Sequence, residues 1–123
     1  MELEVKQAGP NVLVAFGGRT DLEGDDAAAF KDRMKALVAD GARRVVVDLG
    51  NVAFMDSGGL GALLSCLKAL KQAEGHLVLA NVSTPVESVL RITRLERVFE
   101  LRANVDDACR ALDRRPVTAE RGA

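Results

Sequence analysis

A short, almost continuously apolar run at residues 44–49 constrains the fold of this chain more than any other feature. It contains three consecutive valines, Val45 to Val47, and ends with Asp48 and Leu49. β-Branched side chains favour strands, and a strand that is apolar on both sides of its pleat is covered on both faces. Such strands occupy the middle of parallel sheets that carry helices on either side. We therefore expect residues 44–49 to form a central strand.

The N-terminal residues predict a β-hairpin. Apolar residues alternate with polar ones at Leu3 and Val5, and a second apolar run covers Val12 to Phe16. Between them lies Gly9-Pro10-Asn11, a combination typical of a tight turn. Two antiparallel strands should therefore begin the fold.

Four further segments repeat apolar residues with helical spacing. Their apolar stripes are Phe30, Met34, Leu37 and Val38; Leu60, Leu63, Leu64, Leu67 and Leu70; Val86, Val89 and Leu90; and Val105, Ala108, Cys109 and Leu112. Gly41 and Gly75 follow the first two stripes and predict the ends of those helices. Thr84-Pro85-Val86-Glu87 predicts the start of the third helix, with proline at the first position and Glu87 completing a capping box with Thr84.

Two more apolar segments, Leu77 to Ala80 and Phe99 with Leu101, predict strands. The predicted order is β-β-α-β-α-β-α-β-α, an α/β fold with a mixed sheet, an N-terminal β-hairpin and about four helices. We expect one domain over residues 1–113, followed by a polar, flexible tail over residues 114–123.

The loops that follow parallel strands meet at one edge of a sheet. Three such loops are expected here, at residues 18–21, 56–59 and 81–84. They should share a face, and we expect that face to be the functional surface.

The charge balance of the chain excludes several classes of partner. The 123 residues carry 17 basic and 18 acidic side chains, a formal net charge of −1. This balance does not favour direct binding of nucleic acid or of an anionic membrane. No apolar stretch approaches the roughly 18 residues that insert across a bilayer, and the N-terminus lacks the basic start and apolar run of a signal peptide. We expect a cytoplasmic protein.

The sequence predicts no metal site and no cofactor. Cys66 and Cys109 lie far apart and outside any metal-ligand motif, and His76 is the only histidine. A zinc site would therefore lack ligands. We expect both cysteines to be reduced packing residues.

The segment Met55 to Gly61, with the sequence Met-Asp-Ser-Gly-Gly-Leu-Gly, carries the clearest functional signal. It separates the expected central strand from the second helix, so Ser57 should be exposed where that helix begins. Ser57 could be only a helix cap, because a serine hydroxyl accepts readily from first-turn N–H groups. It could instead accept a phosphate, which would add about −1.5 to −2 charges beside Asp56.

Two neighbouring carboxylates are open to a structural and a functional interpretation. Asp56 can fix its loop by accepting from backbone N–H groups, and Asp21 can cap or position the first helix. Neither role excludes contact with a partner.

Two catalytic interpretations of the motif fit poorly. A phosphate-binding loop would need a lysine followed by serine or threonine, and these are absent. A nucleophile elbow would need glycine where Met55 stands, and His76 would be the only candidate base. We expect no enzymatic activity.

The segment Phe54 to Gly61, in its strand-loop-helix position, resembles the STAS domain family and in particular bacterial anti-sigma factor antagonists. Supporting matches are Gly18 to Asp21, the strand over residues 45–49, Gly75, and Val89 to Phe99. The resemblance covers nearly the whole chain.

The resemblance implies that Ser57 is phosphorylated by an anti-sigma factor that is also a serine kinase. The unphosphorylated antagonist captures this kinase and frees a sigma factor, and a serine phosphatase restores the unphosphorylated form. The implied partner-binding residues are Asp21, Asp56, Ser57, Gly58, Gly59, Leu60 and Gly61. The alternative is a STAS scaffold or transport-associated subunit that needs no phosphorylation.

Three positions depart from the family pattern. Gly58 replaces a second hydroxyl residue, Arg19-Thr20 replaces an acidic residue followed by an apolar one, and Arg94 takes a place often held by glycine. A left-handed backbone at Arg94 would cost on the order of 1 kcal/mol.

Overall fold

The structure is a computed structural model that describes residues 1–115. Its elements in chain order are β1 Leu3–Ala8, β2 Asn11–Phe16, β3 Thr20–Leu22, α1 Gly24–Ala39, β4 Arg44–Asp48, β5 Val52–Met55, α2 Ser57–Gln72, β6 His76–Ala80, α3 Thr84–Ile92, the 3-10 helix η1 Leu95–Arg97, β7 Glu100–Arg102 and α4 Val105–Asp113. The predicted mixed α/β fold with four helices is confirmed. Most of the predicted polar tail lies outside the described residues.

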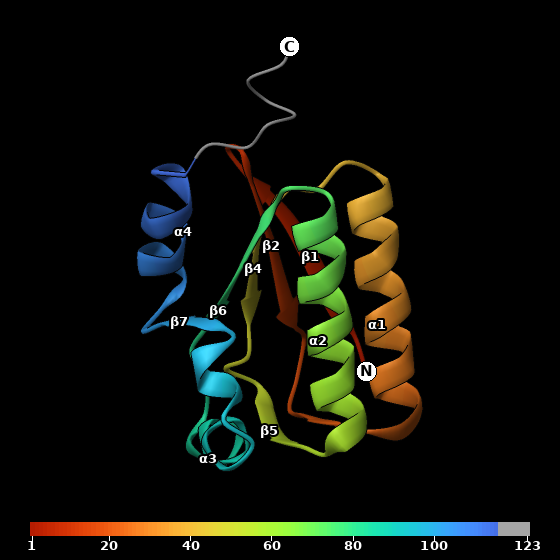
Figure 1. Ribbon diagram of the computed structural model, residues 1–123. Helices are drawn as coiled ribbons and strands as arrows, with labels where there is room; N and C mark the ends of the chain where they lie inside the picture. Colours follow the sequence, from red (N-terminus) through yellow and green to blue (C-terminus); the bar gives the residue numbers. More distant parts are fainter. Residues whose placement is uncertain (116–123) are drawn as a thin grey trace.

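The main sheet has five strands in the order β1-β2-β4-β6-β7. β1 runs antiparallel to β2, and the remaining neighbours are parallel. Helices α1 and α2 cover one face of this sheet and α4 covers the other, while α3 packs on β5 at one end (Figure 1).

β4 is the central strand, as its valine run predicts. Val45 and Val47 belong to the large core beneath α1 and α2, whereas Val46 joins the smaller core beneath α4. All three valines are fully buried. Successive side chains of a strand point to opposite faces, so a run of consecutive apolar residues packs against helices on both sides of the sheet.

The N-terminal hairpin is also confirmed. Ala8 pairs with Asn11, so Gly9 and Pro10 form a two-residue turn. Gly9 has a φ of 60°, which a residue without a side chain adopts at little cost.

The sequence pattern did not predict β3 and β5. These two short strands pair with each other in parallel and form a separate two-stranded sheet. Each has only three or four residues, and each depends on a partner about thirty positions away, as the pairing of Thr20 with Val52 shows. Local periodicity carries no signal for such a pairing.

The end of α2 differs from the prediction. Gly41 ends α1 in a left-handed conformation, as expected, but after α2 the left-handed residue is Glu74, with a φ of 61°. Gly75 is needed for a different reason, because a Cβ there would lie 2.5 Å from the Arg43 carbonyl oxygen. Arg94 has a φ of 61° as well, so the strained backbone expected at that position is present.

The predicted capping box of α3 is wrong. The residue before the helix is Ser83, and Thr84 is already helical. The Ser83 hydroxyl donates to the Val52 carbonyl oxygen at 2.9 Å instead of capping α3, and the Glu87 carboxylate pairs with Arg91. The Ser83 side chain is therefore engaged by β5, a segment about thirty residues away that the local sequence pattern does not reveal.

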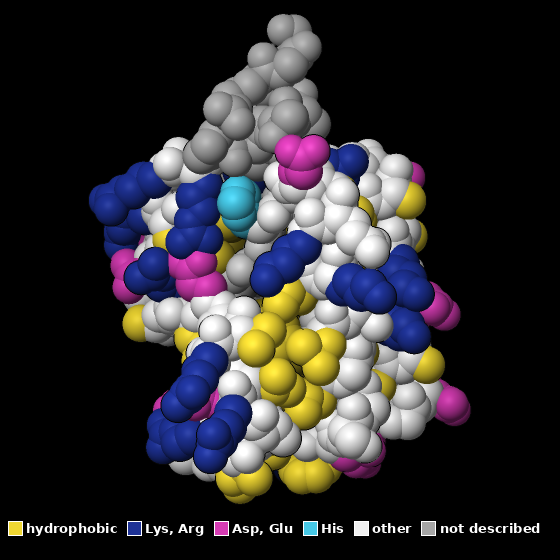
Figure 2. Space-filling view, viewed as in Figure 1, with side chains coloured by type: hydrophobic (Ala, Val, Ile, Leu, Met, Phe, Trp, Pro, Cys, Tyr) yellow, Lys and Arg dark blue, Asp and Glu magenta, His cyan; other side chains and the backbone are white. Residues whose placement is uncertain are grey.

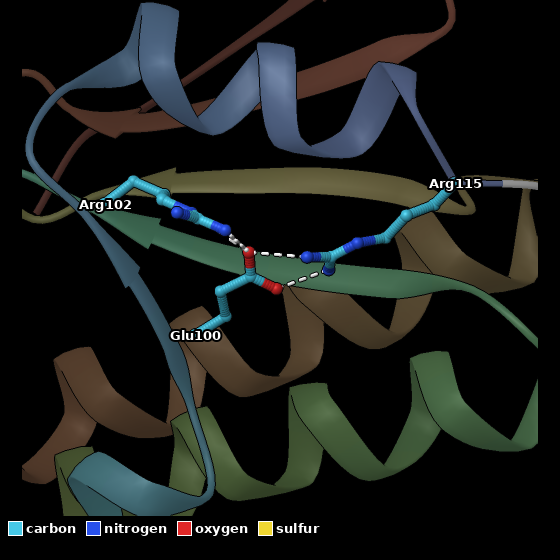
Figure 3. Close-up of polar contacts among 3 residues, drawn as sticks. All are labelled: Glu100, Arg102 and Arg115. Atoms are coloured by element: carbon cyan, nitrogen blue, oxygen red, sulfur yellow. Dashed lines mark hydrogen bonds and ion pairs between the residues drawn. The ribbon is translucent and has the colours of Figure 1, made fainter.

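An ion-pair cluster holds the last described residues on the sheet (Figure 3). Glu100 of β7 accepts from Arg102 at 2.7 Å and from Arg115 at 2.6 Å. The buried Arg44 side chain donates to the Arg115 carbonyl oxygen at 2.6 Å. Arg115, which the sequence pattern assigns to the tail, is therefore tied to β4 and β7.

We predict opposite effects of changes at the two residues after α2. Glu74→Gly should stabilise the protein by about 1 kcal/mol, because glycine tolerates the left-handed backbone. Gly75→Ala should destabilise it by about 2 kcal/mol or more, because its Cβ meets backbone that cannot move freely. Urea unfolding of each variant measures both values.

Gly61→Ala is the matched control for this pair. A Cβ at Gly61 meets nothing within 4 Å, so alanine should stabilise α2 by about 0.5–1 kcal/mol. Equal effects of alanine at Gly61 and Gly75 would contradict the close approach to Arg43.

We also predict that the Glu100 cluster makes stability depend on pH. Hydrogen bonding to Arg115, followed by Arg102, lowers the pKa of the Glu100 carboxyl below its ordinary 4.5. Because the folded-state pKa is lowered, the cluster stabilises the protein above the ordinary value and the contribution is lost as the pH falls through the lowered one. Glu100→Gln should cost about 1–2 kcal/mol at neutral pH, and the difference from wild type should shrink in acid.

Denaturant unfolding as a function of pH measures this difference. Glu87→Gln is the control, since the exposed pair of Glu87 with Arg91 should contribute less than about 0.5 kcal/mol. A pH-independent loss in Glu100→Gln would show that the carboxylate charge does not matter.

Candidate functional site

The two-stranded sheet brings the predicted functional loops together at one end of the molecule. The Thr20 N–H donates to the Asn51 carbonyl oxygen at 2.8 Å, and Asp21 lies opposite Phe54 in the ladder. Figure 1 shows β5 at the lower end, leading into the start of α2. β3 and β5 thus carry the chain from the carboxyl ends of β2 and β4 to this surface.

The third predicted loop, residues 81–84, joins the same end. The Asn81 side chain donates at 3.2 Å to Asp48, the last residue of β4. The hydrogen bond from Ser83 to Val52 links this loop to β5. The expectation that the three loops share a face is therefore confirmed.

Asp56 is the N-cap of α2. Its Oδ1 accepts from the Gly58 N–H at 2.9 Å and from the Gly59 N–H at 3.1 Å, and its backbone is extended. A carboxylate at this position satisfies two unpaired donors and complements the positive end of the helix dipole. The loop-fixing role considered for Asp56 is present.

Ser57 is the first residue of α2, and its side chain is exposed. Since Asp56 takes the capping role, the interpretation of Ser57 as the helix cap is wrong. Among the described residues, no side-chain hydrogen bond engages the Ser57 hydroxyl. The structure therefore places an exposed hydroxyl group at the N-terminus of α2.

The other motif residues divide between surface and core. Gly58 and Gly61 are exposed, whereas Gly59 and Leu60 are buried. A Cβ at Gly59 would clash with the Leu22 carbonyl oxygen, so only glycine lets the first turn of α2 pack on the end of β3. Gly59 and Leu60 hold the turn in place, and their exposed neighbours face outward.

Asp21 lies on the exposed side of β3. Its carboxylate is 3.9 Å from the guanidinium of Arg19, whose side chain is largely exposed. The N-cap of α1 is Glu23, whose side chain makes no capping hydrogen bond. Asp21 therefore does not cap α1, and its carboxylate remains available at the surface.

Two helix N-termini meet at this end of the molecule, each with carboxylates nearby. α1 and α2 run side by side in the same direction in Figure 1, and a Cβ at Gly58 would lie 3.9 Å from that of Ala27. Asp25 and Asp26 lie in the first turn of α1, and Asp56 precedes α2. The side chains around Ser57 are therefore mostly acidic, and the partial positive charge of the two helix N-termini offsets part of their negative charge.

His76 cannot act on Ser57. It is the first residue of β6 and pairs with Arg44 at the start of β4, whereas Ser57 lies beyond the carboxyl ends of these strands. The histidine that the nucleophile-elbow interpretation would need as its base therefore lies at the opposite end of the sheet from Ser57.

The cysteines are free and are not activated. Burial raises the pKa of the Cys66 thiol to about 12, and it also raises that of Cys109. Within residues 1–115, no group of three or more His, Cys, Asp or Glu side chains could hold a metal ion. Over the same residues, no helix has the length and hydropathy needed to cross a membrane.

The sequence did not indicate that Phe54 lies at the surface. Its side chain is 43% exposed, next to the motif and opposite Asp21. A phenylalanine in an apolar segment is normally expected in the core, so the sequence offered no signal for its position.

The site belongs to a chain with clear relatives. The family model described as STAS domain matches residues 3–108. The anti-sigma-B factor antagonist of Staphylococcus aureus is 36% identical over 88 residues, which cover 72% of this chain and 80% of that protein.

Solved structures support the same relationship. The crystal structure of an anti-sigma factor antagonist from Mycobacterium paratuberculosis has a TM-score of 0.78 at 26% identity, covering 91% of this chain and 93% of that one. The phosphorylated form of the Bacillus cell fate determinant SpoIIAA has a TM-score of 0.68 at 17% identity, covering 89% of this chain and 99% of that one. With its fold, its motif and these matches in agreement, the chain belongs to the STAS domain family.

Proposed function

We propose that this chain is an anti-sigma factor antagonist whose binding to an anti-sigma factor is switched by phosphorylation of Ser57. The observation that carries the proposal is the exposed Ser57 hydroxyl, free of internal hydrogen bonds among the described residues, in the first turn of α2. The names of the relatives from Staphylococcus aureus and Mycobacterium paratuberculosis support the antagonist role. The phosphorylated form of a structural relative supports the modification.

The proposed partner is an anti-sigma factor that is also a serine kinase, and a serine phosphatase reverses the modification. The kinase contacts Asp21, Asp56, Ser57, Gly58 and Gly61, the motif residues that reach the surface. Gly59 and Leu60 contribute by fixing the first turn of α2. A sigma factor acts on cytoplasmic RNA polymerase, so the proposed role places the chain in the cytoplasm, without direct contact to DNA.

The switch requires only a local change of charge. The Asp56 carboxylate already accepts hydrogen bonds from the N–H groups of Gly58 and Gly59. A phosphate on Ser57 could bind these N–H groups only by displacing that carboxylate. The added charge of about −1.5 to −2 therefore stays at the surface, where it must be desolvated when a partner binds. A hundredfold loss of affinity corresponds to only about 2.7 kcal/mol. The fold need not change, because a helix N-terminus tolerates the phosphate.

We predict that purified anti-sigma factor kinases from the source genome, incubated with the chain and ATP, will place one phosphate on Ser57. Mass spectrometry of the peptide that contains Ser57 identifies the site. Ser88→Ala, which removes an exposed serine of α3, should be modified like wild type, and Ser57→Ala should not be modified. A phosphate on another residue in the Ser57→Ala variant would contradict the assignment.

We further predict that Ser57→Ala binds the kinase as tightly as the unmodified chain, while phosphorylated wild type binds about a hundredfold more weakly. Ser57→Asp should be weakened in the same direction. Isothermal titration calorimetry measures these affinities. Equal binding by the alanine and aspartate variants would favour the alternative, a STAS scaffold or transport-associated subunit without a phosphorylation cycle.

A further inference from the structure

Phe54 is exposed although its strand is otherwise directed toward the core. In β5, Val52 and Met55 are buried at 0% and 1% exposure, while Phe54 is 43% exposed. Leaving a large aromatic side chain in water forgoes the free energy that its burial would release. This position therefore calls for an explanation beyond folding.

The exposure of Phe54 results from a register shift between β3 and β5. Thr20 pairs with Val52, but the next residue, Asp21, pairs with Phe54, so Ala53 is an extra residue without a partner. Regular alternation would put Val52 and Met55, three positions apart, on opposite faces. The irregularity lets both be buried and turns Phe54 outward, in the way that bulges redirect side chains near functional sites.

Phe54 is close in the chain both to Ser57 and to residues that line an apolar hollow. Phe54 is three residues before Ser57, and the residues that precede it in β5, Val52 and Ala53, line a hollow of about 410 Å³ together with Pro85 and others. Figure 2 shows hydrophobic atoms at the lower end of the molecule, where Figure 1 draws β5 and α3. An exposed aromatic side chain, on a strand that also lines an apolar hollow, is suited to anchor a binding partner.

We propose that Phe54 is the apolar anchor through which the partner kinase holds the Ser57 surface. This inference rests on the proposed function and adds the chemistry of the partner. The kinase must offer an apolar socket that accepts a benzyl side chain, and it must carry lysine or arginine at the rim of that socket, opposite Asp21.

The charge around Phe54 favours the kinase over a second copy of the chain as the protein that binds this surface. Asp21 lies directly opposite Phe54, and Glu23 and Asp56 are close in the sequence to the paired strands. A symmetric dimer through this face would bring these carboxylates of two copies together, whereas a partner with basic side chains neutralises them. Arg19 offsets one of these charges through its contact with Asp21.

The test uses the kinase that phosphorylates Ser57 in the experiment above, with three variants of the full chain. Phe54→Ala should weaken kinase binding about tenfold or more and raise the KM for phosphorylation of Ser57, while its unfolding midpoint stays at the wild-type value. Phe54→Leu, which keeps an apolar anchor, should recover most of the affinity. Val98→Ala is the matched control, because Val98 is 44% exposed and follows η1, which packs on α3 and β7.

Each result either supports or overturns the anchor. Wild-type affinity in Phe54→Ala, or an equal loss in Val98→Ala, overturns it while leaving the proposed function intact. A wild-type chain that binds none of the kinases overturns the proposed function and the anchor together. A dimer in sedimentation velocity that Phe54→Ala dissociates also overturns it, since the occupant would then be a second copy.

Discussion

The burial of β4 on both faces is the constraint on which the rest of the structure depends. Its valines alternate between the core beneath α1 and α2 and the core beneath α4. Helices must cover both faces of β4, and helical crossovers return the chain to the end of the sheet where the previous strand began. The strands on either side of β4 are therefore parallel to it. The loops after β2, β4 and β6 consequently gather at one end of the sheet, the end at which Ser57 lies.

Two contacts hold the first turn of α2 in place, and neither involves the Ser57 side chain. Asp56 occupies the donors of the first helical turn, and Gly59 allows that turn to pack against the Leu22 carbonyl. Neither contact uses the Ser57 hydroxyl. Under the proposed function, a phosphate at this hydroxyl would change recognition without a change of fold, because no internal contact of the first turn depends on the hydroxyl.

The small sheet of β3 and β5 gives this surface its shape. It extends beyond the ends of the main strands and links the Asp21 loop to the motif. Its register shift buries Val52 and Met55 and turns Phe54 to solvent. The same irregularity thus completes the core and leaves an aromatic side chain exposed three residues before Ser57.

The sequence alone determined the central strand, the N-terminal hairpin, the four helices and the position of Ser57 at the start of a helix, because these depend on local periodicity and on a motif of consecutive residues. Tertiary structure alone decided the pairing of β3 with β5 and the outward direction of Phe54. It also put the left-handed backbone after α2 at Glu74, and it brought the Arg43 carbonyl so close to residue 75 that only glycine fits there. These features depend on residues far apart in the chain, whose contacts leave no periodic pattern in the sequence.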